Sequence, residues 1–286
     1  MDSIKANTEN LTSLWSTVGR LKNAFFSIDE SIEYCIIISS HWPNRLWFKN
    51  PVNNIILEKT KAILVNSKVS AKVSYWYHSD DNKPKHFEQY GFVKSSEQTG
   101  TSLKLFLEYH SDSTIVLQGF TKPTEAILWS DLFRKAFNYT ISYDVVALSC
   151  NVVNYFIVYS QNIPVGTCML YHNNPKVVGI HSMGIIPEMR RRGIGEKVLK
   201  EILNISVGQE FKYATLQASV AAKPLYEKYG FTTQFNPKNS WNFLPRGLTF
   251  YKILSNSDLS RIIHQKMMNN DDKQLKILFL SCLCQD

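Results

Sequence analysis

Three arginines and two glycines stand together in the second half of the chain, immediately before an apolar helical pattern. They are Arg190, Arg191, Arg192, Gly193 and Gly195. Glycine lets a backbone approach a ligand closely, and the first N–H groups of a helix attract anions. Arginine adds forked donors for phosphate oxygens. The spacing therefore predicts a binding site for a phosphorylated ligand, although a structural turn beside a solvated basic patch has the same composition.

Other kinds of chemistry have weaker signals. No Ser–His–Asp or Cys–His arrangement is apparent, and Cys168 lies within a predicted strand, where a thiol is expected to be inert. The chain has 5 cysteines, and no pair has zinc-ligand spacing with histidines nearby. We therefore predict neither a metal site nor a disulfide framework.

The composition is that of an ordinary globular protein. Of 286 residues, 44% are hydrophobic and 20% are charged, with a formal net charge of +8. Such a charge favours polyanions, but the basic residues are spread along the chain, so nucleic acid is an unlikely partner. The N-terminus is polar and no apolar run is long enough for a membrane span. We expect no membrane partner, and a cytoplasmic location.

The elements around the arginines predict a layered α+β fold. Two helices and three apolar strands precede the loop; a helix, a strand, a second helix and two closing strands follow it. The expected helices cover 125–139, 143–151, the segment from Gly193, and 221–229, and the strands cover 155–159, 165–171, 177–186, 213–217, 231–235 and 247–253.

Two motifs in this segment resemble those of the GNAT superfamily of acyl-CoA N-acyltransferases. Arg190, Gly193 and Gly195 occupy the positions of the family's R/Q-x-x-G-x-G/A motif. About thirty residues on, the segment 222–231 resembles the family's A-x-x-L-Y-E-K-x-G-F. The resemblance covers roughly 119–253 and implies a GNAT-like mixed sheet flanked by helices, with acetyl-CoA as cofactor and coenzyme A as product.

The resemblance also implies residue roles. The backbone from Arg191 to Gly195 would hold the pyrophosphate, and Tyr226 would protonate the departing thiolate. Ser219 stands where relatives often have an asparagine that faces the cofactor. The complete set of implied cofactor-binding residues is Met183, Gly184, Ile185, Arg190, Arg191, Arg192, Gly193, Ile194, Gly195 and Ser219.

The general base departs from the family pattern. Some relatives have a glutamate where this chain has Gly179. His181, two residues on and on the same strand face, is the nearest titratable substitute. A histidine on a strand is also a common structural residue, and His172 and Glu125 are weaker alternatives.

The first half resembles a GNAT half without the glycine loop. An expected helix (52–66), strand (71–78) and short helix precede F-E-Q-Y-G-F at 87–92, which echoes Y-E-K-Y-G-F at 226–231. Strands are expected at 103–109 and 114–118. We therefore predict three parts: a second, degenerate GNAT-like α+β domain (1–118), the acyltransferase domain (119–254) and a helical tail (255–286). The tail could pack on its own protein, dock a partner or form a homodimer contact.

The predicted function is transfer of an acetyl group from acetyl-CoA to an amine, by direct attack in a ternary complex. The acceptor is a small molecule or a peptide. The alternative is a non-catalytic acyl-CoA-binding sensor or assembly protein, which would bind the cofactor without turnover.

Overall fold

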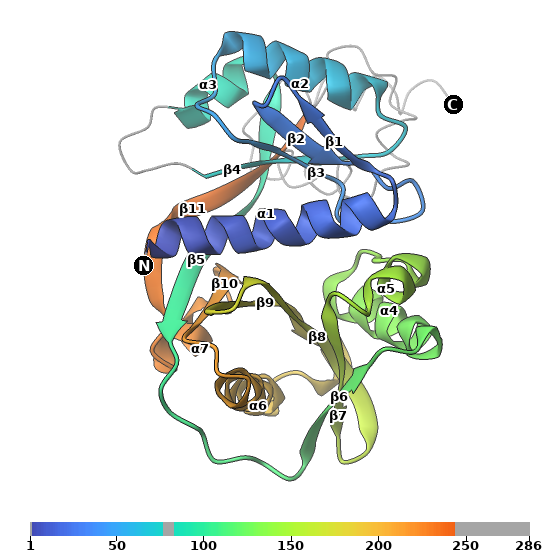
Figure 1. Cartoon of the computed structure of the whole chain (residues 1–286), viewed down its shortest axis with the longest axis vertical. Coiled ribbons are helices and arrows are strands. Elements are labelled where there is room, and N and C mark those ends of the chain that lie inside the picture. The colour runs from blue at the N-terminus through green and yellow to red at the C-terminus, as the bar shows by residue number, and fades with distance from the viewer. Residues whose placement is uncertain (1, 77–82, 244–286) are drawn as a thin grey trace, which may run out of the picture.

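A computed structural model of the chain describes residues 2–76 and 83–243. Its strands form one 11-stranded mixed sheet with the order β1-β2-β3-β4-β11-β5-β10-β9-β8-β7-β6. Helices cover both faces of the sheet (Figure 1). The expected α+β class, a GNAT-like mixed sheet flanked by helices with a second α+β half before it, is confirmed. The expected strand at 247–253 and the tail from residue 255 lie outside the described residues.

The first half begins with a long helix and continues with four short strands, two helices and one long strand, β5. Its elements are α1 (Ser3–Leu21), β1 (Phe25–Ile28), β2 (Ile32–Cys35), β3 (Arg45–Phe48), α2 (Asn54–Asn66), β4 (Lys72–Tyr75), α3 (Lys83–Gln89) and β5 (Phe92–Lys104).

The second half consists of β6, whose segment was expected as a closing strand of the first part, and of the elements expected around the arginines. They are β6 (Ile115–Phe120), α4 (Pro123–Phe137), α5 (Tyr143–Ser149), β7 (Asn154–Ser160), β8 (Ile163–Asn174), β9 (Val177–Ile185), a 3-10 turn (Pro187–Met189), α6 (Ile194–Gly208), β10 (Tyr213–Ser219), α7 (Lys223–Lys228) and β11 (Thr232–Phe243). No helix in the described ranges has both the length and the apolar character needed to cross a membrane.

The two halves are joined because each contributes one long strand that pairs with strands of the other half. β5, from the first half, lies between β10 and β11, and β11, from the second half, lies between β4 and β5. The expected strand at 103–109 is wrong, because β5 ends at Lys104 and begins at Phe92. Its sequence lacks the apolar alternation by which a half-buried strand is recognised, and the structure makes it a strand through backbone pairing along both edges.

The repeat between the halves is visible in the topology. β3 and β4 are parallel strands joined through α2, as β9 and β10 are joined through α6. The glycine of each Y-G-F sequence ends a helix with the same left-handed φ, 84° at Gly91 and 84° at Gly230. These features support a GNAT-like first half, whereas the boundaries at 118 and 254 stay predictions.

The face of the second half's sheet that carries Met169 and Tyr171 packs against α1, α4 and α5. The opposite face, which carries Cys168 and Val178, packs against α6 and α7. α1 lies across the middle of the molecule between the two halves (Figure 1). Both faces of this sheet are therefore covered, and one of the covers comes from the N-terminus.

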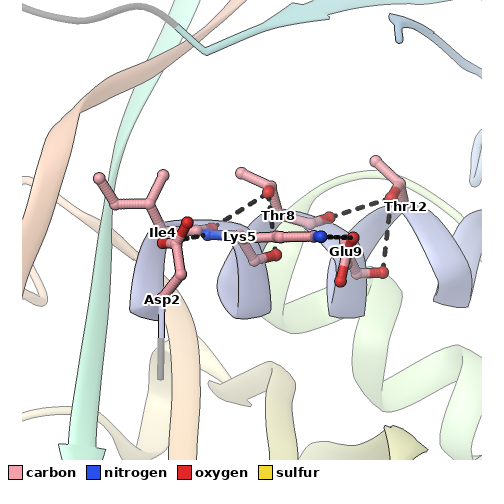
Figure 2. A network of polar contacts seen from close by, with 6 residues as sticks. All are labelled: Asp2, Ile4, Lys5, Thr8, Glu9 and Thr12. Carbon is pink, nitrogen blue, oxygen red and sulfur yellow. Dashed lines mark hydrogen bonds and ion pairs between the residues drawn. The ribbon is translucent and has the colours of Figure 1, made fainter.

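The exposed side of α1 satisfies its polar groups locally, as Figure 2 shows. The side chain of Asp2 caps the helix by accepting a hydrogen bond from the N–H of Lys5 at 3.1 Å. Lys5 also forms an ion pair with Glu9, at 3.7 Å. The hydroxyls of Thr8 and Thr12 bond to carbonyls one turn earlier in the helix. The contacts of α1 with the sheet come from its other side.

Candidate active site

The arginine–glycine loop (residues 190–195) is open at the start of α6. Arg191 and Gly193 have left-handed φ values of 61° and 73°. A Cβ added at Gly193 or at Gly195 would meet no atom within 4 Å. Gly195 has no left-handed φ, so neither packing nor backbone strain within the described residues requires a glycine there. An outside group that approaches the backbone closely would require one.

Backbone donors gather at this opening. Among the described residues, the N–H groups of Arg191, Arg192 and Gly193 donate no hydrogen bond. The first N–H groups of α6 also lack partners within the helix, as at any helix start, and no side chain caps them. The helix dipole adds partial positive charge at the same point. This arrangement can bind a phosphate or pyrophosphate.

The matching loop of the first half is closed. There α2 is capped by Asn53, whose side-chain oxygen accepts a hydrogen bond from the N–H of Ile56 at 2.9 Å. The cap occupies a donor that an anion would otherwise use. The two halves thus share a topology, and the second half has the open helix start.

The three arginines differ in their surroundings. Arg190 donates to the carbonyl oxygens of Ile185, at 2.9 Å, and Ala136, at 2.6 Å. It therefore braces the end of β9 against the end of α4. Arg192 donates to the carbonyl of Glu188 at 3.2 Å, and Arg191 is exposed. Arg191 and Arg192 themselves carry two of the open backbone donors.

A fork opens in the sheet between β9 and β10. The two strands pair only from Val177–Gly179 to Tyr213–Thr215 and then separate. On its other edge β9 stays paired with β8, with a register shift beside Ser182, whose φ is 50°. Met183, Gly184 and Ile185 are half-buried in the separated part of β9. Gly184 is also needed for packing, because a Cβ there would lie 2.5 Å from the ring of Phe137.

Tyr226 lies on the α6–α7 face of the sheet. Its side chain is 7% exposed and contacts Phe231 edge-on, with ring centroids 5.6 Å apart. Burial, with a smaller contribution from Cys168, raises the pKa of Tyr226. The hydroxyl forms no hydrogen bond within the described residues. It is therefore a protonated donor at neutral pH without a protein partner of its own.

His181 lies on the opposite face, beneath α1, and is 8% exposed. Its Nε2 is 2.9 Å from Oδ1 of Asn10. Gly179 has no room for a side chain, since a Cβ there would lie 1.9 Å from the same Oδ1. His181 and Tyr226 therefore lie on opposite faces of the sheet. The fork opens between β9, which carries His181, and β10.

The remaining predicted residues occupy supporting positions. Ser219 ends β10, and its hydroxyl accepts a hydrogen bond from the N–H of Ala222 at 3.3 Å in the turn before α7. The two alternative bases are peripheral: His172 is exposed and contacts the ring of Phe211, and Glu125 lies in the first turn of α4. Within the described residues, no three His, Cys, Asp or Glu side chains gather as metal ligands.

Sequence reasoning missed two sets of side chains. Asn7 and Asn10 of α1 are fully buried against the fork. Glu196, in the first turn of α6, accepts hydrogen bonds from Lys228 at 2.9 Å and from the hydroxyl of Tyr229 at 2.6 Å, so the E-K-Y segment locks α7 to α6. The sequence does contain a sign of the asparagines: Asn7 and Asn10 continue the apolar stripe of α1, although asparagine favours helix caps over helix interiors.

Comparison with known proteins identifies the second half. Residues 124–231 match the family model described as "Acetyltransferase (GNAT) family". These residues form a GNAT domain. The GNAT domain contains the whole loop, the fork, His181 and Tyr226, and the family is that of acetyltransferases. No curated protein matches the sequence.

Solved structures share the fold over most of the chain. A GCN5-related N-acetyltransferase from Kribbella flavida has a TM-score of 0.63 and 11% identity, covering 85% of this chain and 97% of its own. One from Sphaerobacter thermophilus has a TM-score of 0.55 and 12% identity, covering 77% and 83%. A tandem GNAT protein from the clavulanic acid biosynthesis pathway has a TM-score of 0.51 and 10% identity, covering 74% and 77%. At these identities the likeness establishes the fold.

Proposed function

We propose that this protein is an N-acetyltransferase that transfers an acetyl group from acetyl-CoA to the amine of a small molecule or peptide, by direct attack in a ternary complex. The observation that carries the proposal is the open helix start at Gly193 and Gly195, where nothing in the described chain fills the space over either glycine. The capped start of α2 is the internal contrast.

The residues present fit acetyl-CoA. The backbone from Arg191 to Gly195 would hold the pyrophosphate, with the side chains of Arg191 and Arg192 beside it. The guanidinium of Arg190 already serves two carbonyls, so its contribution would be to hold the loop in place. The separated edge of β9 at Met183, Gly184 and Ile185 would bond the pantetheine arm as an added strand does, and Ser219 would lie beside it.

Two side chains would move protons. The thioester supplies the activated acetyl group, and the amine nitrogen forms the new C–N bond as the C–S bond breaks. His181 would take the proton that the amine loses, and Tyr226 would give its proton to the departing sulfur. The strand amides near Met183 and Ile185 would polarise the carbonyl. The raised pKa of Tyr226 supports its part, because it keeps the hydroxyl protonated.

Titration calorimetry with acetyl-CoA tests the binding site. We compare the wild type, Gly195→Glu and Gly208→Glu. Both glycines lie in α6 with nothing within 4 Å of an added Cβ, but they lie at opposite ends of the helix. A carboxylate at the phosphate site should weaken binding by more than about 10-fold, whereas the same change at Gly208 should leave it near the wild-type value. Equal effects of the two changes, or no binding to the wild type, would contradict the proposal.

Turnover tests the chemistry. Thiol release from acetyl-CoA is followed with panels of small amines and of peptides. Release that depends on an amine, together with an acetylated product, supports the transferase. Tight binding with no release for any amine would instead support an acyl-CoA sensor or assembly protein. The cytoplasmic location and a homodimer stay predictions.

A further inference from the structure

Two asparagines of α1 hold the two sides of the fork. Asn7 donates to the carbonyl oxygens of Thr101, at 3.0 Å, and Leu216, at 3.1 Å, and accepts from Gln217 at 2.6 Å. These partners belong to β5 and β10. Asn10, one turn later on the same side of the helix, bonds to β8 and β9 instead. Each side of the fork is thus tied to the N-terminal helix.

The amide of Asn10 has one orientation that satisfies all its neighbours. Its Nδ2 lies 3.0 Å from the carbonyl oxygen of Tyr171 and 3.5 Å from Oδ1 of Asn173, and both of these atoms are acceptors. Reversing the amide would set its oxygen against the carbonyl oxygen of Tyr171, which cannot donate a hydrogen bond. Oδ1 of Asn10 must therefore face His181, and because that oxygen can only accept, Nε2 of His181 must carry the hydrogen.

Gly179 makes room for this contact. A Cβ at that position would lie 1.9 Å from Oδ1 of Asn10 and 2.4 Å from Nε2 of His181. The space beside Gly179 is thus filled by the hydrogen bond between Asn10 and His181. This contact joins residues of α1 and β9 that are 171 positions apart in the sequence.

We propose that Asn10 is a positioning residue that fixes the neutral ring of His181 as the Nε2–H tautomer and so makes Nδ1 its basic nitrogen. In a neutral imidazole the nitrogen that does not carry the hydrogen is the one that accepts a proton. The catalytic consequence rests on the proposed function; the tautomer does not. The first half would then contribute a positioning residue, Asn10, to the site of the second half.

Nitrogen NMR of ¹⁵N-histidine-labelled full-length protein tests the tautomer directly. The chain has 7 histidines, so His181→Gln identifies the resonances of His181. In the neutral ring, we expect Nε2 in the protonated form and Nδ1 in the unprotonated form. The opposite tautomer in the wild type would overturn the proposal before any variant of α1 is made.

Three variants separate positioning from general stability. Asn10→Leu should lose the fixed tautomer. Asn10→Asp keeps an acceptor oxygen for His181 and should retain Nε2–H, but its second oxygen faces the carbonyl of Tyr171 and should lower stability. Asn7→Leu is the matched control, since it removes the hydrogen bonds of an equally buried asparagine on the same face of α1. It should destabilise the fold and leave the tautomer unchanged. If Asn7→Leu and Asn10→Leu alter the ring alike, or if Asn10→Leu keeps the tautomer, Asn10 does not position His181.

Steady-state kinetics gives the catalytic readout. Because general base catalysis contributes about 10²- to 10⁴-fold, loss of ring positioning in Asn10→Leu should lower kcat roughly 10- to 100-fold and change KM for acetyl-CoA less than about 3-fold. Asn10→Asp should recover most of the loss. If the wild type shows no amine-dependent turnover, the proposed function fails, while the NMR result still decides the role of Asn10.

Discussion

Replacement of Tyr226 by phenylalanine should separate catalysis from stability. Tyr226 is 7% exposed, and its hydroxyl has no hydrogen-bond partner within the described residues. The ring contact with Phe231 is retained by phenylalanine. Tyr226→Phe thus removes the predicted acid and leaves no other side chain unpaired.

The expected stability change follows from these contacts. Burying a hydroxyl without a hydrogen bond costs about 1–3 kcal/mol in proteins, and this hydroxyl is not fully buried. Tyr226→Phe should therefore be as stable as the wild type or more stable by up to about 1 kcal/mol, a Tm rise of roughly 2 °C. The folded pKa of Tyr226 lies above its ordinary value of 10.0. The wild type should therefore lose stability relative to the variant as pH rises above about 10, because only the unfolded tyrosine ionises there.

Loss of a general acid should lower kcat by about 10²-fold or more. Urea denaturation and thiol release are measured on the same preparations. Tyr155→Phe is the control: the hydroxyl of Tyr155 bonds to Ser149 at 2.8 Å, so the variant should lose about 1 kcal/mol and keep wild-type turnover. Unchanged kcat in Tyr226→Phe would refute the acid role. A large loss of stability would refute the description of its hydroxyl as unpartnered.

Two other predictions concern polar contacts that join one element to another. Burial alone would raise the pKa of Asp144, but hydrogen bonds from Lys22 and Ser39 outweigh it and hold the pKa at about 2. The folded pKa is below the unfolded value near 4, so Asp144→Asn should lower the free energy of unfolding by about 1 kcal/mol at pH 7, after discounting for the 34% exposure of the Asp144 side chain. The difference should shrink as pH falls from about 4 to about 2, and urea denaturation at both ends of that range measures it. Arg190→Met removes both carbonyl contacts, so it should lower the free energy of unfolding by about 1 kcal/mol and weaken acetyl-CoA binding roughly 10-fold in calorimetry. If the variant binds acetyl-CoA as tightly as the wild type does, the contacts of Arg190 are not needed for binding.

The sequence by itself determined the local parts of the second half. The apolar runs that become β7, β8 and β9, the loop with Gly193 and Gly195, and the Y-E-K-Y-G-F segment are all specified by short-range requirements of backbone and burial. Such requirements act within a few residues, so they are legible without the fold. They also exposed the repeat in the first half, which the left-handed glycines at 91 and 230 now support.

The tertiary structure alone decided how the site is assembled. The exchange of β5 and β11 depends on pairing along both edges of a polar strand, which no local pattern encodes. The brace by Arg190 reaches α4, 54 positions away, and the contact of Asn10 with His181 joins residues 171 positions apart. The role of a side chain in these contacts depends on which atoms the fold brings within hydrogen-bond distance. That is fixed only when α1 and α4 pack on the sheet.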